Sequence, residues 1–193
     1  MLKKILITLA LAGFFSCHSY RPGLVPPSGP HFRSLAVKFS FHDPETRQNG
    51  RVSWRYDDNG SKFLFFTPLN QVGVELDVAD EEAVLVNFSK KSFWRGDFSY
   101  LLDRLWGIGL PLAELRSLLD VGEAPPAGFA EKGIVATVER DSGSGAPRSV
   151  LLQRGTATLL LRIQKSEYRP GRIVLIDYAG RYREADLESV LEE

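Results

Sequence analysis

Apolar and polar residues alternate along much of the chain and predict a long series of strands. Residues 35–41 and residues 52–56 both have the period-two pattern of a strand with one buried face. The pair Asn49-Gly50 lies between them and supplies the positive φ angles of a tight hairpin turn, so we expect two antiparallel neighbours. A second turn at residues 57–60 leads to residues 62–66, a strand that is apolar on both faces.

The same alternation continues on both sides of a helical segment. We expect further strands at residues 72–78, 84–88, 91–95, 134–138, 150–152, 158–163 and 173–176. A flexible turn at residues 141–145 separates two of them. The acidic terminus, residues 184–193, is equally compatible with a frayed helix and with a last edge strand.

The hydrophobic period changes at Asp97. Apolar residues then recur at helical spacing up to Gly107, and Asp97 is a good N-cap. Pro111 suits the first turn of a second helix that ends near Gly122. The pattern therefore predicts one α+β domain, in which a large antiparallel sheet is curved or partly closed into a barrel and has helices packed against its mouth.

Composition narrows the range of functions. The chain has 193 residues with 24 basic and 24 acidic side chains, which fits one globular domain and argues against nucleic-acid binding. A single cysteine can form neither an internal disulfide nor a cysteine zinc site. The three histidines, His18, His31 and His42, all lie in the first quarter of the chain and leave little for catalysis or metal binding. We therefore expect no enzyme, no metal and no cofactor.

The motifs of a hydrolase are incomplete. Gly143-Ser144-Gly145 lacks the strand-to-helix context of a nucleophile elbow, and no histidine follows it in the chain. Asp97 and Asp103 fit a helix cap and a solvated helix face better than a catalytic pair.

The first residues have the pattern of a secretion signal. A short positive start is followed by residues 5–15, an apolar run without charge that is shorter than the ~20 residues a membrane-spanning helix needs. We expect a signal peptide at residues 1–16, a lipid-attachment site and flexible tether at residues 17–31, and a single domain at residues 32–193.

The sole cysteine follows a small residue at the end of this signal. Ser16-Cys17 resembles the lipobox of bacterial lipoproteins, in which the cysteine becomes the lipidated first residue. Residue 18 is histidine rather than aspartate, which favours an outer-membrane address facing the periplasm; the alternative is a free thiol after cleavage elsewhere. Cleavage would remove two lysines and leave 22 basic against 24 acidic residues, so we expect no polybasic patch that assists membrane binding.

Leu69 is unusual among the apolar residues. It follows Pro68 in a loop between turn-forming and polar residues, where its side chain can point into water. The clustered aromatic residues in the middle of the chain allow both a filled core and an interior that holds an apolar ligand.

Several segments in order resemble the LolB family of outer-membrane lipoprotein receptors. They are SLAVKFSF, RVSWRY, FLFFTPLNQVGVELDV, YLLDRLWGIGLPLAELRSLL and GEAPPAG, covering roughly residues 33 to 128. The region from Tyr168 to Glu193 matches the family poorly. The resemblance implies a half-open β-barrel with a helical lid, which accepts lipoproteins from the soluble periplasmic carrier LolA and releases them into the outer membrane.

The resemblance also implies roles for individual residues. Pro68 and Leu69 fall in the family's protruding loop, whose leucine promotes delivery into the membrane. Candidates for the wall of a cavity that holds lipoprotein acyl chains are Trp54, Phe63, Phe65, Trp94, Leu101, Leu105 and Leu115. We expect a monomer, anchored in the outer membrane through lipid on Cys17.

Two other functions fit the same sequence. A structural or assembly lipoprotein would bind a protein partner at a sheet edge or groove and would have a filled core. A relative of the receptor family would carry another apolar lipid.

Overall fold

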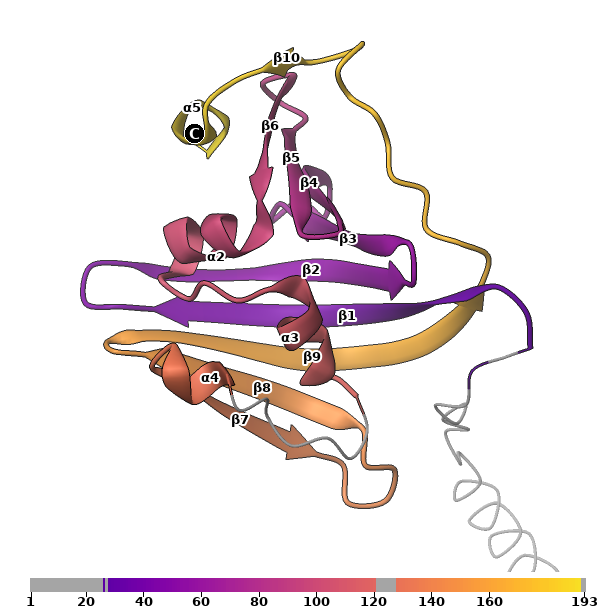
Figure 1. Ribbon diagram of the computed structural model, residues 1–193, viewed down its shortest axis with the longest axis vertical. Coiled ribbons are helices and arrows are strands. Elements are labelled where there is room, and N and C mark those ends of the chain that lie inside the picture. The colour runs from indigo at the N-terminus through magenta and orange to yellow at the C-terminus, as the bar shows by residue number, and fades with distance from the viewer. Residues whose placement is uncertain (1–25, 27, 121–127, 192–193) are drawn as a thin grey trace, which may run out of the picture.

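The computed structural model describes residue 26, residues 28–120 and residues 128–191. Within these residues ten strands form one sheet, in the order β10-β6-β5-β4-β3-β2-β1-β9-β8-β7 (Figure 1). The strands are β1 His31–His42, β2 Arg47–Asp57, β3 Gly60–Phe66, β4 Val72–Ala79, β5 Glu82–Asn87, β6 Ser92–Asp97, β7 Ile134–Arg140, β8 Pro147–Arg154, β9 Ala157–Pro170 and β10 Arg183–Glu184. The helices are α2 Phe98–Trp106, α3 Leu112–Ser117, α4 Gly128–Glu131 and α5 Leu187–Leu191.

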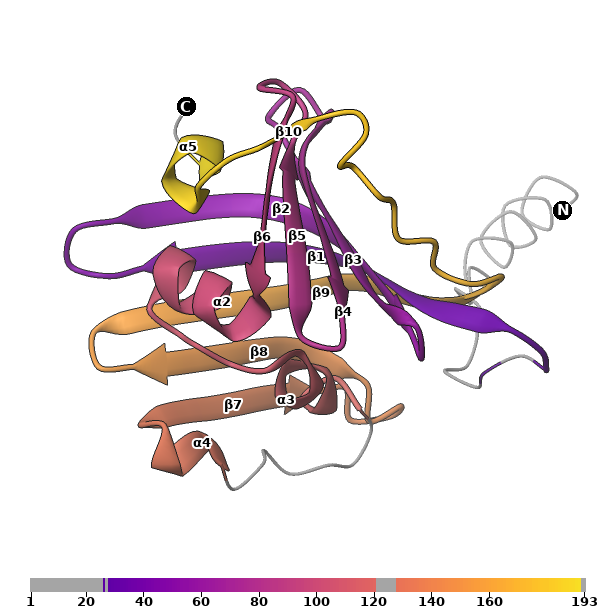
Figure 2. The same cartoon turned by 45° about the horizontal axis from the view of Figure 1, so that its top comes forward.

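The sheet is strongly curved and open. β1, β2, β9 and β8 lie side by side, and β4, β5 and β6 rise steeply from them (Figures 1 and 2). Neighbouring strands are antiparallel, except that β10 pairs with β6 in parallel. Helices α2, α3 and α4 all lie on one face, called the inner face below (Figure 2). The predicted α+β class, with a curved antiparallel sheet under a helical lid, is confirmed.

Apolar side chains fill the space between the inner face and the helices. The inward positions of β1 and β2 alternate with more exposed ones, and the buried pair Leu35 and Trp54 lie directly opposite each other. Helix α2 adds Phe98 and Leu101 to this core, and α3 adds Leu115. The period-two and helical patterns of the sequence therefore meet in one core.

The first hairpin turns at residues 43–46, so the predicted turn at Asn49-Gly50 is wrong. Gly50 pairs with Phe39 inside the β1–β2 ladder, and a Cβ on Gly50 would lie 2.4 Å from the Phe39 ring. The glycine thus leaves room for that ring. The turn is stabilised instead by Asp43, whose Oδ1 accepts hydrogen bonds from two backbone amides of the turn at 2.9 and 2.6 Å. The predicted antiparallel pairing is confirmed.

The caps of α2 are those that the sequence predicts. The side chain of Asp97 accepts a hydrogen bond from the backbone N of Tyr100 at 2.7 Å. Gly107 ends the helix with φ 63°, a conformation that costs glycine little.

Helix α3 is shorter than expected because it ends at Ser117, and the proposed cap Gly122 lies outside the described residues. Pro111 precedes the helix as its N-cap residue rather than lying in its first turn. The capping acceptor comes from elsewhere: the Glu81 carboxylate accepts a hydrogen bond from the backbone N of Leu112 at 2.8 Å. Glu81 lies in the β4–β5 turn, so this turn positions the start of the lid.

The C-terminal segment crosses the outer face of the sheet, opposite the helices. Residues 173–176 do not form the expected strand, because their amides bond to carboxylates instead of to a neighbouring strand. The backbone N of Ile173 donates to Asp57 at 2.8 Å, and that of Ile176 donates to Asp77 at 3.1 Å. The acidic terminus then forms both of the structures that its sequence allows, an edge strand, β10, followed by a short helix, α5.

A buried charged cluster fastens this segment to β3 and β4. Lys62 forms ion pairs with Glu75 and Asp77, and its Nζ lies 2.9 Å from Oδ2 of Asp77. The hydroxyl of Tyr178 donates to Glu75 at 2.6 Å. Burial raises the pKa of Asp77, and the hydrogen bond from Lys62 opposes that rise. The polar groups of the cluster thus compensate one another beneath the segment.

The predicted signal peptide, Cys17 and most of the tether lie outside the described residues. The sheet begins at His31, and the buried core lies within and beyond β1. A chain that begins at residue 18 therefore retains the complete sheet and core. In the part of the chain that the structure describes, no helix has the length and apolar character needed to cross a membrane.

Candidate functional site

An apolar cavity of about 50 Å³ lies between the inner face and helices α2 and α3. Aromatic rings form one wall, with centroids 4.9 Å apart for Trp54 and Phe63 and 6.0 Å apart for Phe63 and Phe98. The lining side chains are all hydrophobic: Val37, Phe39, Val52, Trp54, Phe63, Phe65, Leu76, Leu85, Phe98, Leu102, Leu105, Trp106, Ile108, Leu115, Leu152, Leu159 and Leu161. Such a lining selects an apolar ligand.

Most of the proposed cavity residues lie in this lining. The members are Trp54, Phe63, Phe65, Leu105 and Leu115. Trp94 and Leu101 lie outside the lining of the closed cavity. Leu101 is fully buried in the core, and the Trp94 ring lies 6.3 Å from that of Tyr100. Helical and strand spacing identify an inward face, but they do not distinguish a cavity wall from packed core.

A polar boundary closes one end of the apolar interior. The indole Nε1 of Trp54 donates to the hydroxyl of Ser61 at 3.0 Å, and Nη2 of Arg116 also donates to that oxygen at 3.0 Å. The Arg116 guanidinium stands 5.3 Å from the centroid of the Tyr56 ring, within the range of a cation–π contact. Burial lowers the pKa of Arg116. Helix α3 is thereby joined to β2 and β3.

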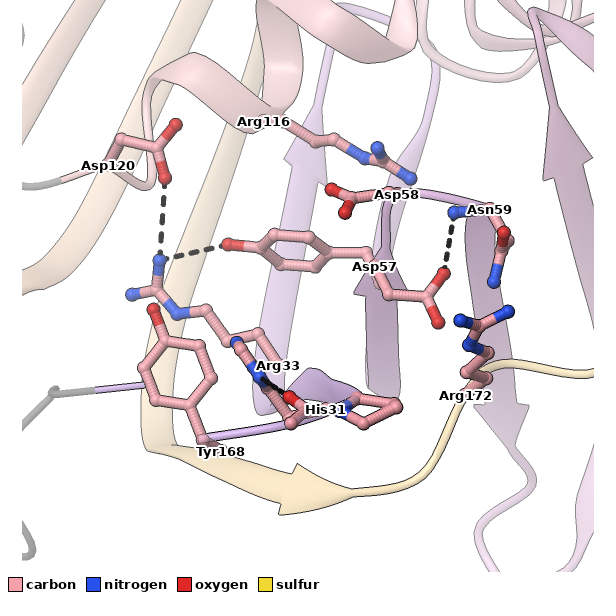
Figure 3. Close-up of a pocket in the computed structure, with 12 residues that line it drawn as sticks. His31, Arg33, Asp57, Asp58, Asn59, Arg116, Asp120, Tyr168 and Arg172 are labelled. Carbon is pink, nitrogen blue, oxygen red and sulfur yellow. Dashed lines mark hydrogen bonds and ion pairs between the residues drawn. The ribbon is translucent and has the colours of Figure 1, made fainter. Parts of the chain in front are cut away.

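Beyond this boundary lies a polar pocket of about 460 Å³ (Figure 3). It is lined by Gly29, Pro30, His31, Arg33, Tyr56, Asp57, Asp58, Asn59, Arg116, Asp120, Tyr168 and Arg172. Three guanidinium groups face three carboxylates, so the formal charges of the pocket balance. The pocket lies where residues 29–30 lead into β1.

Arg33 connects this pocket to the lid. Only 5% of Arg33 is exposed, and its Nη1 donates to the hydroxyl of Tyr56 at 2.9 Å and to the backbone carbonyl oxygen of Leu119 at 3.0 Å. Asp120 lies 3.6 Å from the same nitrogen (Figure 3). Burial raises the pKa of Tyr56 to about 12, and the charge of Arg33 opposes the rise. The guanidinium thus fastens the chain just after α3 to the sheet.

The sequence prediction missed Arg33, Tyr56 and Arg116. A signal for two of them was present, because Arg33 and Tyr56 lie on the inward phase of their strands, in register with Leu35 and Trp54. A cation on the buried side of a strand needs a partner. Arg116 carried no such signal, since its role depends on how α3 lies over β3.

The β3–β4 loop presents Leu69 to solvent. Leu69 is 82% exposed, the largest exposure among the large hydrophobic residues described. The loop is closed by hydrogen bonds from the backbone N of Asn70 to the Thr67 carbonyl oxygen at 2.9 Å and from the backbone N of Thr67 to the Gln71 carbonyl oxygen at 2.8 Å. Asn70 has φ 64°. A tight turn therefore holds the leucine outward, next to Pro68.

The incomplete hydrolase motifs have structural roles. Ser144 lies in an exposed turn, where its hydroxyl donates to Asp141 at 3.1 Å. Asp97 caps α2, and Asp103 pairs with Arg154 at 2.6 Å on the exposed side of that helix. Within the described residues no three side chains are arranged to hold a metal ion.

Comparison with known proteins identifies the family. The family model described as "Outer membrane lipoprotein LolB" matches residues 32–167. The outer-membrane lipoprotein LolB of Azoarcus sp. (strain BH72) is 25% identical over 119 residues, which are 62% of this chain and 57% of that protein. The chain thus matches little more than half the length of this relative.

Two solved structures are also similar at 8% sequence identity. A LolA superfamily protein, NE2245 from Nitrosomonas europaea, has a TM-score of 0.43 over 76% of this chain and 89% of its own. An uncharacterized conserved protein from Thermus thermophilus has a TM-score of 0.41 over 80% of this chain and 89% of its own. The family match covers the sheet from β1 to most of β9 together with helices α2, α3 and α4, and on that match the chain belongs to the LolB family of outer membrane lipoproteins.

Proposed function

We propose that this protein accepts lipoproteins from a periplasmic carrier by taking their acyl chains between the sheet and the lid, and then helps insert them into the outer membrane. The observation that carries the proposal is the wholly hydrophobic lining of the cavity under α2 and α3. Membership of the LolB family supports the same task. Lipid on Cys17 would hold the receptor at that membrane.

The cavity has to enlarge before it can hold an acyl chain. Its volume is about 50 Å³, whereas ligand pockets commonly measure about 300–1,000 Å³. The element suited to move is α3, which has six residues and is too short to be stable by itself. It is held by hydrogen bonds that involve Arg33, Arg116 and Glu81 and by the burial of Leu112 and Leu115 in the core, and opening of the lid has to release both kinds of contact.

Energetics determine the order of the steps. Each methylene exposed to water costs about 0.8 kcal/mol, so an acylated cargo passes from cavity to cavity without entering solvent. The receptor must hold the cargo more tightly than the carrier does and less tightly than the bilayer does. Leu69, exposed on its turn, is placed to enter the lipid surface during release.

A fatty-acid binding experiment tests the cavity. The chain from residue 18 onward is titrated with a fluorescent fatty acid, and native mass spectrometry counts the bound molecules. We expect stoichiometric binding that weakens at least about tenfold when Leu115→Glu places a charge in the cavity wall. Val135→Glu, on the exposed side of β7, is the matched control and should bind as the unmodified chain does.

The rival function is an assembly lipoprotein that binds a protein partner and has a filled core. The small volume of the closed cavity favours it. A folded protein that binds no fatty acid at any concentration below the solubility limit would support this rival and contradict the receptor function.

A further inference from the structure

Three cations form a row across the outer face of the sheet. Lys38 on β1 lies directly opposite Arg51 on β2 and directly opposite Arg162 on β9. All three side chains are exposed. Side chains at directly opposed positions have Cβ atoms about 5 Å apart, where like charges repel. We call Arg162, Lys38 and Arg51 the basic row.

The basic row lacks a compensating charge in the described part of the chain. None of its three side chains forms an ion pair or hydrogen bond there, although many other exposed cations do. Glu139 lies in register with the row, but it is two strands away from Arg162 and accepts a hydrogen bond from Ser149 at 2.6 Å. An arrangement that repels itself without a partner points to a ligand of negative charge.

The basic row leads directly to the loop that carries Leu69. Arg51 lies opposite Phe66, the last residue of β3, and the loop follows at once. A shallow groove of about 360 Å³ is bordered by Lys38, Arg51 and Asn70 of the loop. A second groove of about 410 Å³ is bordered by all three cations. The exposed leucine and the cations thus belong to one continuous surface.

We propose that the basic row binds the phosphate groups of anionic lipid headgroups, and so docks the outer face of β1, β2 and β9 on the membrane with Leu69 at the lipid surface. Guanidinium groups bind phosphate oxygens in a bidentate manner, and the lysine adds a point charge. An apolar side chain beside exposed cations matches the polarity of a bilayer surface, where headgroups lie above acyl chains.

This inference rests on the proposed function, because a receptor that unloads cargo into a bilayer has to hold its loop against that bilayer. It differs from the expectation, made from the sequence, that no polybasic patch assists membrane binding, and the vesicle experiment below decides between the two. Residues 38, 51 and 162 are far apart in the sequence, and only the strand register brings them together.

Vesicle binding without cargo tests the proposal. The chain from residue 18 onward is mixed with vesicles of phosphatidylcholine, or with vesicles in which a third of the lipid is phosphatidylglycerol, and sedimentation measures the bound fraction. We expect binding to the anionic vesicles that decreases with salt. The triple variant Lys38→Gln, Arg51→Gln, Arg162→Gln should bind about a hundredfold more weakly, at about fivefold for each cation. Equal binding of the triple variant and the unmodified chain would overturn the proposal.

A matched control separates position from net charge. The variant Lys91→Gln, Arg172→Gln, Arg181→Gln removes three exposed cations outside the row that form no side-chain ion pair among the described residues. The affinity of this control variant for the anionic vesicles should fall only a few-fold. A loss as large as that of the row variant would mean that net charge alone explains binding, and would contradict a docking surface. The exchange Lys38→Arg, Arg51→Lys retains the charge and should retain binding, even if neutralisation of the row impaired folding.

An acidic protein partner is the other class of ligand that a basic surface could bind. Acceptance of a lipoprotein from its carrier, measured without vesicles, distinguishes the two. The proposal predicts that the row variant accepts cargo at the unmodified rate, and failure to accept cargo with vesicle binding intact would overturn it. Because the vesicle experiment contains no cargo, its result does not depend on the receptor function being correct.

Discussion

Arg33 on β1 donates a hydrogen bond from Nη1 to the backbone carbonyl oxygen of Leu119, just after α3, at 3.0 Å. The guanidinium is buried, and its Nη2 has no hydrogen-bond partner among the described residues. The contact joins the first strand to the end of the lid. Opening the lid would exchange this bond for solvation of a buried cation, and it would also expose the buried side chains of Leu118 and Leu119.

Arg33→Leu should loosen the lid. The substitution removes the donor to Leu119 and should cost about 1–3 kcal/mol of local stability. Hydrogen exchange of the amides in residues 112–120 should become faster by about tenfold or more, and fatty-acid uptake should accelerate. Arg172→Leu removes an exposed guanidinium from the same pocket and serves as the control. Unchanged exchange in the Arg33 variant would exclude the guanidinium as the fastening of α3.

Leu69→Glu should separate cargo binding from cargo release. The side chain is exposed, so folding and fatty-acid affinity should remain unchanged. Release of a bound lipoprotein into liposomes should become about tenfold slower or more, because a carboxylate enters lipid poorly. Val174, which is 72% exposed, is the control position, and the Val174→Glu variant should release cargo at the unmodified rate. Equal release rates from the Leu69 variant and the unmodified chain would contradict this role.

Lys62→Met should destabilise the fold strongly at neutral pH. It leaves the buried carboxylates of Glu75 and Asp77 without their cation, which typically costs about 3–5 kcal/mol. Burial raises the pKa of Asp77, so the loss should diminish as the pH falls and the Asp77 carboxylate takes up a proton. Urea denaturation at several pH values measures both effects. The control is Lys165, an exposed residue that forms an ion pair with Glu167. Lys165→Met should change the free energy of unfolding by less than about 1 kcal/mol.

Alkaline pH should destabilise the protein through Tyr56. Its pKa is raised from 10.0 to about 12, so the native state holds the phenolic proton more tightly than the unfolded chain does. This contribution is complete below pH 10 and is lost as the pH rises towards 12, up to about 2–3 kcal/mol. The Tyr56→Phe variant has no phenolic proton, so its free energy of unfolding should not show this decrease between pH 10 and 12. Free energies of unfolding that decline in parallel for the two proteins between pH 10 and 12 would contradict the assignment.

The sequence predicted the elements better than their connections. Asp97 and Gly107 cap the two ends of α2 as the sequence predicts, because capping residues are local signals. The Asn49-Gly50 turn was wrong, because the Asp43 carboxylate stabilises a turn at residues 43–46 by local hydrogen bonds, and the Phe39 ring packs over Gly50 across the hairpin. Tertiary contacts of this kind override a dipeptide preference.

The candidate site was predictable where it depends on local pattern. The exposure of Leu69 follows from its turn, and inward positions such as Trp54 follow from alternation. The basic row depends on the register of β9 against β1, and the contact of Arg33 with Leu119 depends on where the lid lies. Neither can be derived from spacing in one sequence.

Lipoprotein transfer tests the receptor function most directly. A purified periplasmic carrier is loaded with a lipoprotein and mixed with the folded chain from residue 18 onward, and the two proteins are then separated. We expect the lipoprotein to move onto this chain, and to move onward when liposomes are added. A lipoprotein that stays on the carrier would contradict the receptor function.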